Sequence, residues 1–315
     1  MAASIWKDYE VSFGNIAETD YTIEVPGVGE IFAGHAVRRP DAAQLTVRIN
    51  DVCADYLLHT IPSVASKVSI AEDSAVTFSV KDGGGTTVDT VQFVADWSFD
   101  HDHTPAVLSD PVNGHVSAAQ ALIFSVLGTS AVSASLAYKD GTTGSVSVSA
   151  SAGPVQVVSI PLGGYTDLDT VTAGGKTYKV VEGCHRYALL YVNAFGGWDT
   201  LLMEGRWDME DGYDRRTMKQ RYDNAAQSAR GTVEYVNEVT RRWTLRTGWL
   251  TDAQSFRMHH VLGSTHVYLY DIEAGVLVPV VITDTACDYK TYKGNGGRLT
   301  QYAITAELAQ DITRR

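Results

Sequence analysis

Hydrophobic and polar residues alternate with a period of two along most of the chain. Runs such as YTIEV (21–25), AVTFSV (75–80) and TVQFV (90–94) are rich in β-branched and aromatic residues and are bounded by Gly, Asn and Asp. The glycines of KDGGGTT, between the last two runs, can adopt the positive φ of a hairpin tip. Because half-buried strands need a second sheet to cover them, the pattern predicts a β-sandwich-like domain over residues 1–103.

A second strand-rich region follows a connecting segment. Residues 96–115 hold two prolines and few apolar residues, as is typical of a connection. The runs ALIFSVL (121–127) and VQVVSI (155–160) then flank the hairpin signal KDGTTG. We expect residues 104–180 to form a second β-module.

The last part of the chain, residues 181–315, is richer in aromatic and charged residues. Two apolar runs around Gly196 and Gly197 predict a strand, a tight turn and a partner strand. Residues 206–224 are dense in charges of both signs and predict a solvated arm or loop, whereas 232–249 predict one long strand. Hairpin patterns follow to the end of the chain, so we expect an α+β domain of antiparallel hairpins.

The clearest helix signal lies in TDAQSFRMHHVLG, residues 251–263. Thr251 and Gln254 have the spacing of a capping box, and Gly263 stands where a left-handed residue ends a helix. The predicted fold class is therefore mainly β, with two β-sandwich-like modules and a C-terminal α+β domain that contains one short helix.

Three histidines, His259, His260 and His266, lie within eight residues of one another at the end of this segment and just after it. On a helix, His259 and His260 point about 100° apart, whereas paired helical zinc ligands use an i, i+4 spacing. We expect His260 to be a packing residue beside an apolar stripe of Met258, Val261 and Leu262, with His259 at its rim. His266 begins the next strand, facing solvent or a neighbouring subunit.

The stretch DHDH, Asp100 to His103, is the second candidate for a metal. Carboxylates and imidazoles together can hold a divalent ion, and alternate residues of an extended chain share a face. No third ligand follows from the spacing, so a solvated linker is the favoured interpretation, and the ion remains an open alternative. We predict no metal site and no cofactor.

Composition narrows the function classes. With 37 acidic and 25 basic residues, the formal net charge is −12, which opposes attachment to phosphate backbones and anionic lipid. We expect neither specific nucleic-acid binding nor membrane insertion. The start MAASIWKDYEVSFG is charged where a secretory signal is apolar, and no run approaches the roughly 18 apolar residues of a membrane span. The chain is expected to be soluble.

The three cysteines, Cys53, Cys184 and Cys287, form no CxxC pair. We expect them to be core hydrophobes in a protein made in a reducing compartment. The chain also lacks GxSxG, HExxH and Walker motifs. Carboxylates of the charged arm, such as Asp208, Glu210 and Asp211, could do acid and base work on a sugar, but a solvated arm explains them better. We predict no catalytic residue.

Several long segments resemble a known family. SIWKDYEVSFG at the start, RRPDAAQLTVRINDVCADYL (38–57), FVADWSFD (93–100), YALLYVNAFGGWDTLLMEG (187–205), LRTGWLTDAQSFRMHHVLGSTHVYLYD and VPVVITDTACDYKTYK are similar to tail structural proteins of the distal tail and baseplate type, encoded by bacteriophages and prophages of gut anaerobic bacteria. The resemblance covers both ends and the 187–205 segment, and covers 104–180 weakly. It carries no catalytic motif.

The resemblance implies a virion protein, made in the bacterial cytoplasm, whose β-domains assemble as a ring about the tail axis and contact neighbouring tail proteins. Aromatic and arginine residues are the usual anchors of such interfaces. An acidic surface facing the lumen would let DNA pass without sticking. The candidate interface residues are Arg215, Arg216, Arg221, Arg241, Arg242, Trp243 and Arg246.

The alternative function is a receptor-binding or glycan-binding module at the tail tip. Its candidate residues for stacking on sugar rings are Trp97, Trp198, Trp207 and Tyr213. Core packing is the more frequent role of tryptophan in β-proteins, so the alternative ranks second.

Overall fold

The chain forms two compact units. The computed structural model describes residues 3–5, 9–72, 74–97, 108–151, 153–219, 232–287, 299–310 and 312–314. Unit 1 comprises Met1–Glu182 with Tyr191–Thr200, and unit 2 comprises Gly183–Leu190 with Leu201–Arg315. The fold is mainly β, as predicted: sheets dominate both units and the described helices are short.

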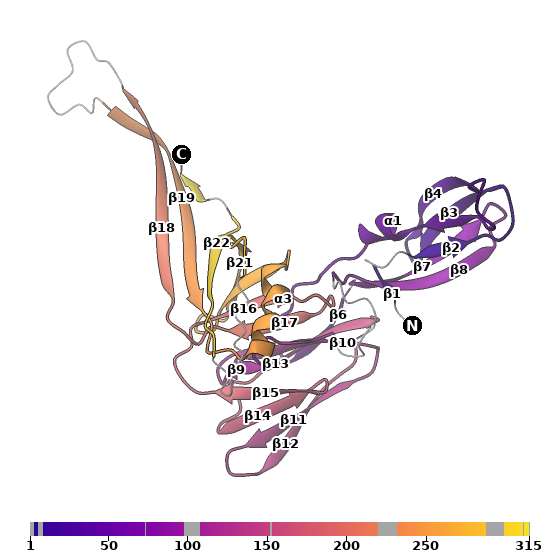
Figure 1. The fold of residues 1–315 in the computed structure, drawn as a ribbon. Helices are drawn as coiled ribbons and strands as arrows, with labels where there is room; N and C mark the ends of the chain where they lie inside the picture. Colours follow the sequence, from indigo (N-terminus) through magenta and orange to yellow (C-terminus); the bar gives the residue numbers. More distant parts are fainter. Residues whose placement is uncertain are drawn as a thin grey trace. The chain divides into compact units, whose positions relative to one another are not determined.

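The first sheet of unit 1 has five strands in the order β1-β8-β7-β3-β4 (Figure 1). They are β1 (Ala3–Ser4), β3 (Glu18–Val25), β4 (Gly29–Val37), β7 (Ala75–Asp82) and β8 (Thr87–Val94). One face is covered by a two-stranded sheet of β2 (Glu10–Ser12) and β5 (Thr46–Arg48) and by α1 (Asn50–Ala54), because Val11, Ile49 and Cys53 share a buried core with Ile23 and Phe78. The sequence pattern had not indicated α1.

The second module of unit 1 is a pair of packed sheets. One has the order β10-β13-β6 and the other β12-β11-β14-β15-β9. Phe124 and Val158 of the first sheet pack with Leu136, Val171 and Tyr178 of the second in one core. The strands are β6 (Val68–Glu72), β9 (His115–Ser117), β10 (Ala121–Leu127), β11 (Val132–Tyr138), β12 (Thr143–Val148), β13 (Val155–Pro161), β14 (Leu168–Ala173) and β15 (Lys176–Val181).

Strand β6 joins two regions that the sequence had separated. It precedes residue 103 in the chain, yet it pairs antiparallel with β13 from Val68↔Ser159 to Glu72↔Val155. Residues 103 and 104, where the first boundary was expected, lie outside the described residues. Both predicted β-modules belong to unit 1.

Unit 2 contains an eight-stranded sheet with the order β17-β16-β20-β21-β22-β19-β18, in which β23 also pairs with β19 (Figure 1). Strands β16 and β17 each contain residues of both units. The strands are β16 (Tyr187–Val192), β17 (Trp198–Leu202), β18 (Asp208–Lys219), β19 (Thr232–Arg246), β20 (Val267–Asp271), β21 (Val276–Ile282), β22 (Ala303–Leu308) and β23 (Ile312–Arg314). Of the charged stretch 206–224, expected as a solvated arm or loop, residues 208–219 form the regular strand β18, and most of its side chains are exposed.

The predicted helix is two short helices, α2 (Asp252–Phe256) and α3 (Met258–Leu262). The capping box is confirmed, because Thr251 accepts from the Gln254 N–H and the Gln254 side chain accepts from the Thr251 N–H. The left-handed end at Gly263 is wrong, since its φ is −88°. The prediction for the histidines is confirmed: His260 is buried with Met258 and Val261, and His259 is exposed.

Candidate interaction surface

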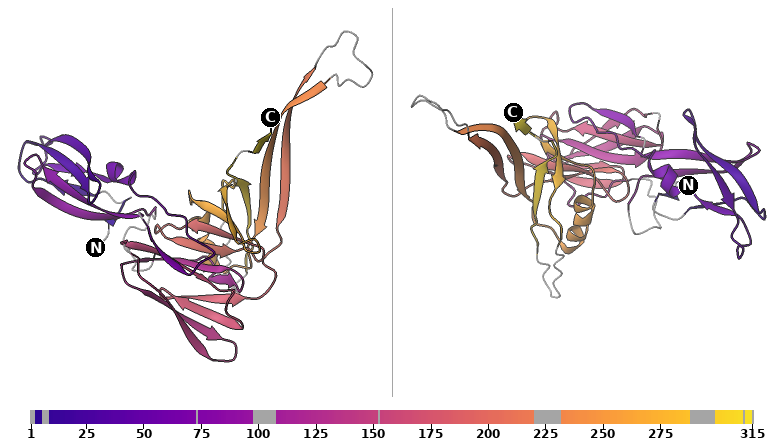
Figure 2. Two further views of the ribbon diagram at one scale, coloured as in Figure 1. Left: turned by 180° about the vertical axis from the view of Figure 1, so that it is seen from behind. Right: turned by 90° about the horizontal axis from the view of Figure 1, so that it is seen from above.

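Strands β18 and β19 form a long two-stranded ribbon, residues 208–219 and 232–246, that runs beyond the rest of the unit 2 sheet (Figures 1 and 2). The two strands pair from Asp208↔Thr244 to Lys219↔Thr232. Strand β22 pairs with β19 only over Arg242–Arg246, and β23 only over Asn237–Val239. Within the described chain, β18 is therefore an edge strand along its whole length.

One face of the ribbon continues the hydrophobic core of unit 2. Trp243 and Leu245 are buried on it and pair with Ala306 and Ile304 of β22. Alternate residues of a strand share a face, so Arg241, two residues before Trp243 in β19, lies on the same face. The prediction that Trp243 anchors a partner is thereby corrected: only 5% of it is exposed, and it belongs to the core.

Asp211 and Arg241 form the tightest ion pair of this face. The arginine Nε donates to Oδ1 at 2.7 Å and its Nη2 to Oδ2 at 2.8 Å. This two-bond geometry matches the planar guanidinium to the carboxylate and lowers the pKa of Asp211 below its ordinary value. Asp211 therefore remains ionised at neutral pH.

The opposite face carries two further tight pairs. Arg246 Nη1 donates to Asp208 Oδ2 at 2.9 Å, which lowers the pKa of that carboxyl. Arg242 Nη2 donates to Glu307 Oε2 at 2.9 Å, and the pKa of Arg242 is raised, chiefly by that bond and further by the charge of Glu210. The predicted residues Arg241, Arg242 and Arg246 are thus engaged within the chain.

Arg215 and Arg216, farther out on β18, are held loosely. Arg215 lies 3.9 Å from Glu234 and Arg216 lies 3.7 Å from Glu238, and the two arginine side chains are 59% and 56% exposed. Pairs of this length and exposure contribute little to stability. Arg215 and Arg216 could therefore exchange these weak contacts for carboxylates of another chain. Arg221 lies outside the described residues.

A stack of aromatic and guanidinium groups lies in the same unit. The rings of Tyr187 and Trp207 meet edge to face with centroids 5.0 Å apart, and the Arg186 guanidinium lies 5.3 Å and 5.4 Å from the two centroids. Arg215 likewise lies 5.7 Å from the Tyr213 ring. Cation–π contacts of this kind also occur within single folded chains, but aromatic and arginine side chains are enriched at protein interfaces. Sequence reasoning missed Arg186, because its partner Trp207 is twenty-one positions away.

The residues proposed for sugar stacking divide by exposure. Trp198 is fully buried and cannot contact a glycan. Trp207 is 36% exposed and Tyr213 is 56% exposed. Trp97 is partly buried in unit 1, where its backbone N–H donates to the Ala194 carbonyl. A glycan site on Trp207 and Tyr213 would therefore lie in unit 2.

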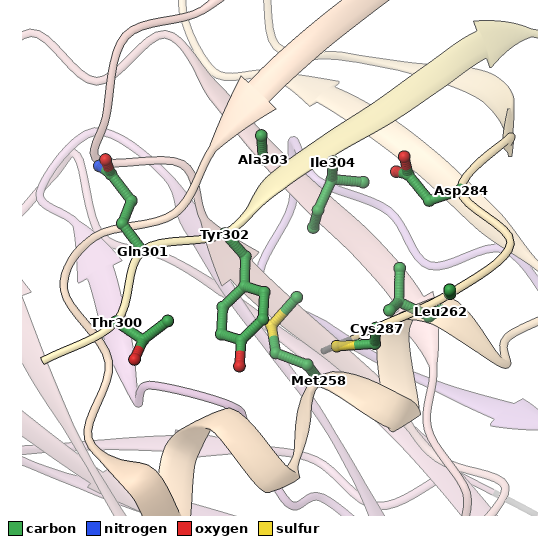
Figure 3. A pocket seen from close by; sticks show the side chains of 10 residues that line it. Met258, Leu262, Asp284, Cys287, Thr300, Gln301, Tyr302, Ala303 and Ile304 are labelled. Carbon is green, nitrogen blue, oxygen red and sulfur yellow. The ribbon is translucent and has the colours of Figure 1, made fainter. Parts of the chain in front are cut away.

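A cavity of about 220 Å³ opens beside α3 and β22 (Figure 3). Met258, Leu262 and Ile304 give it apolar walls, and Asp284 and Gln301 contribute polar groups. These polar groups already serve the fold: Asp284 Oδ2 accepts the Thr305 N–H at 2.6 Å, and Gln301 Nε2 donates to the Thr247 carbonyl at 2.8 Å. The remaining lining residues are Ala286, Cys287, Thr300, Tyr302 and Ala303.

Unit 1 encloses one carboxyl group that the sequence analysis overlooked. Asp199 is fully buried, and its Oδ2 accepts the Asp110 N–H at 2.8 Å and the Asn193 side-chain N–H at 2.6 Å. Burial raises the pKa of Asp199 to about 7, although these two hydrogen bonds favour its ionised form. With no exposed surface, the carboxyl is closed to substrates and ties the segment at Asp110 to β17.

The other sequence candidates are placed as follows. In the described part of the chain, no three His, Cys, Asp or Glu residues gather as metal ligands. The DHDH stretch lies outside that part.

Cys53 is buried, which raises the pKa of its thiol to about 12. Cys184 is exposed, so the expectation of three core cysteines is wrong. None of the described helices is long and apolar enough to cross a bilayer.

Comparison with known proteins identifies no relative: neither a protein-family model nor a curated protein matches the chain.

Proposed function

We propose that this chain is a non-enzymatic structural component of a phage tail, located at the distal tail, tail tip or baseplate. In this proposal it assembles with further copies of itself as a ring and connects neighbouring tail proteins. The resemblance of the segments at both ends and at 187–205 to tail structural proteins is the starting point. The observation that carries the proposal is the exposed β18–β19 ribbon.

A two-stranded ribbon is marginally stable in water unless something covers it. Beyond the strands that support its base, the ribbon exposes large side chains: Tyr213 is 56% exposed, Met218 50% and Tyr235 52%. Aromatic, methionine and arginine side chains are enriched in protein interfaces. Contact with a partner would remove this apolar surface from water, which supports a function through assembly.

The ionisation of two ribbon carboxylates, Asp208 and Asp211, favours an assembly function over sugar hydrolysis. A general acid must hold a proton near neutral pH. The pKa values of Asp208 and Asp211 are lowered by their arginine partners, so both groups are ionised. Their short ion pairs make them structural groups of the ribbon.

Mass photometry and negative-stain electron microscopy of the purified protein, together with mass spectrometry of purified phage particles, test the proposal. We expect a symmetric oligomer and detection of the chain in the particles. Monomers of 34.1 kDa alone at high concentration would overturn the ring. Absence from the particles would overturn the tail role, whatever the oligomeric state.

A glycan-binding tail-tip module is the second candidate, favoured by the half-exposed aromatic rings of Trp207 and Tyr213. A glycan array should then give a binder whose signal is lost in Trp207→Ala and kept in Trp249→Ala, which removes another exposed tryptophan of unit 2. An array without signal above background rules this candidate out.

A further inference from the structure

Strand β18 offers a second chain an open row of backbone hydrogen-bonding groups. It is twelve residues long, has one neighbour in the described structure, and contains no proline. The bulge between Arg216 and Thr217 leaves Tyr235 of β19 as the extra residue, so β18 itself runs without interruption. Long edge strands of this kind pair with other chains unless charge or shape prevents it.

The charges of β18 are distributed unevenly along the strand. Asp208, Glu210, Asp211 and Asp214 occupy the first part, and Arg215, Arg216 and Lys219 follow them. An antiparallel partner with the same sequence would bring the acidic part of one strand against the basic part of the other. Opposite charges placed directly across a strand pair are stabilising, and like charges are destabilising.

We propose that β18 pairs antiparallel with β18 of a second copy of this chain, about a two-fold axis at Tyr213. In this register Asp211 lies opposite the second copy's Arg215, and Glu210 lies opposite the second copy's Arg216. Symmetry gives each pair twice, with the two Tyr213 rings together at the axis. The inference goes beyond the proposed tail function and does not depend on it.

Neighbouring registers are disfavoured by charge. An axis at Asp214 would place two Asp214 carboxylates opposite each other. An axis at Gly212 would oppose Glu210 to the second copy's Asp214. The strand therefore specifies one register, as edges that pair specifically must.

The charged residues that already lie in rows across β22, β19 and β18 would continue, with alternating sign, into the second copy. On one face, Glu307, Arg242 and Glu210 already follow one another across β22, β19 and β18. Within the described structure Glu210 has no ion pair of its own, and the second copy's Arg216 would complete an alternating row. On the other face, Asp211 would lie between Arg241 and the second copy's Arg215. Within their own chain, Arg215 and Arg216 form only long ion pairs, of 3.9 Å and 3.7 Å.

Charge reversal provides the test, because the geometry predicts a specific rescue. Arg216→Glu and Glu210→Arg should each oppose like charges twice in a homodimer and raise its dissociation constant at least about tenfold. Mixed together, the two variants should form a heterodimer, since each reversed charge then meets its opposite. Sedimentation equilibrium of each variant and of the mixture measures this, with one variant tagged. Circular dichroism confirms folding, which these exposed positions should preserve.

A cysteine cross-link tests the register. In a Cys184→Ser background, which removes the exposed native thiol, Tyr213→Cys should oxidise to a disulfide-linked dimer, because the two residues lie directly opposite each other at the axis. Asp214→Cys is the matched control: its counterpart is displaced along the strand beyond disulfide reach. Equal cross-linking of both, or an unrescued mixture of the charge variants, would overturn the self-pairing.

The outcomes separate this inference from the proposed ring. Rings that survive Arg216→Glu unchanged would refute the β18 contact and leave the ring intact. Dimers alone, dissociated by Arg216→Glu and restored by mixing, would support the β18 contact and refute the ring. Monomers at every concentration would refute both.

Discussion

Asp211 and Arg241 face each other across the β18–β19 ladder and are joined by two hydrogen bonds of 2.7 and 2.8 Å. The pair lies where the ribbon leaves the buried core, two residues from Trp243. It fixes the base of a ribbon whose outer part has few other supports. The ion pair therefore links the packed sheet to the exposed surface proposed for assembly.

Replacing Arg241 by Lys should loosen the ribbon. Lysine keeps the charge but cannot make both bonds to Asp211. Hydrogen exchange of the β18 amides should rise by less than about tenfold, because the pair is partly exposed. At a concentration where the protein is monomeric, Arg215→Lys, at the 3.9 Å contact with Glu234, should leave the rates unchanged. In the parent chain, the contribution of Asp211 is present above its ordinary pKa and is lost as pH falls through its lowered pKa.

Trp243→Ala should lower the unfolding free energy of unit 2, whereas an interface residue would affect only assembly. The side chain is 5% exposed and pairs with Ala306 in the core. Removing a buried tryptophan costs about 3–5 kcal/mol of unfolding free energy. Urea denaturation of the monomer measures the loss, and Tyr235→Ala, at an exposed position of the same strand, is the control. Normal stability of the Trp243→Ala chain would contradict a core role for Trp243 and would favour the original prediction that it contacts a partner.

Asp199→Asn should flatten the pH dependence of stability. The folded protein holds the proton of Asp199 up to a pKa of about 7, whereas the ordinary value is 3.8. Between these values the folded state binds more protons, so the unfolding free energy falls as pH rises, by up to about 1.4 kcal/mol per pH unit. Denaturation curves from pH 4 to 8 should show this slope in the parent chain and in the exposed control Asp169→Asn, but not in Asp199→Asn.

Gly197→Ala should destabilise unit 1. A Cβ at this position would lie 2.6 Å from the Leu108 carbonyl oxygen and 2.7 Å from the Leu108 Cβ. The carbonyl cannot move freely, because it accepts the Asn193 side-chain N–H at 2.6 Å. We expect a loss of about 1–3 kcal/mol in thermal or urea unfolding. Gly163→Ala, with no atom within 4 Å of the new Cβ, should be nearly neutral, and equal effects would contradict the close approach.

Thr251→Ala should remove the cap of α2. Its hydroxyl accepts the Gln254 N–H, and the alanine leaves that donor without a side-chain partner. A loss of about 1 kcal/mol is expected from chemical denaturation. Thr251→Ser keeps the hydroxyl and should retain most of the stability. A serine variant as weak as the alanine variant would assign the effect to the lost methyl group.

The amino-acid sequence alone determined the local features of this protein. Alternating burial in β3, where Tyr21, Ile23 and Val25 face the core, follows from a period that neighbouring residues set. The capping box of Thr251 and Gln254 spans three residues and was predicted for the same reason. The positive φ of Gly85 and Gly196 lies at turns that glycine spacing had marked. The fold class and the start of the helix could be predicted from the sequence, because strand alternation and helix capping depend on residues that are close together in the chain.

Only the tertiary structure decided which distant segments meet. The pairing of β6 with β13 joins residues on either side of an expected boundary. The hydrogen bond from the Asp110 N–H to the buried Asp199 carboxylate spans eighty-nine positions, and no local pattern marks either residue. From the sequence, Trp243 was expected to anchor an interface. In the structure it pairs with Ala306 of β22 and is buried in the core. Non-local pairing depends on the shapes and charges of surfaces that exist only once the strands have come together, so alternation predicted the strands but not their neighbours.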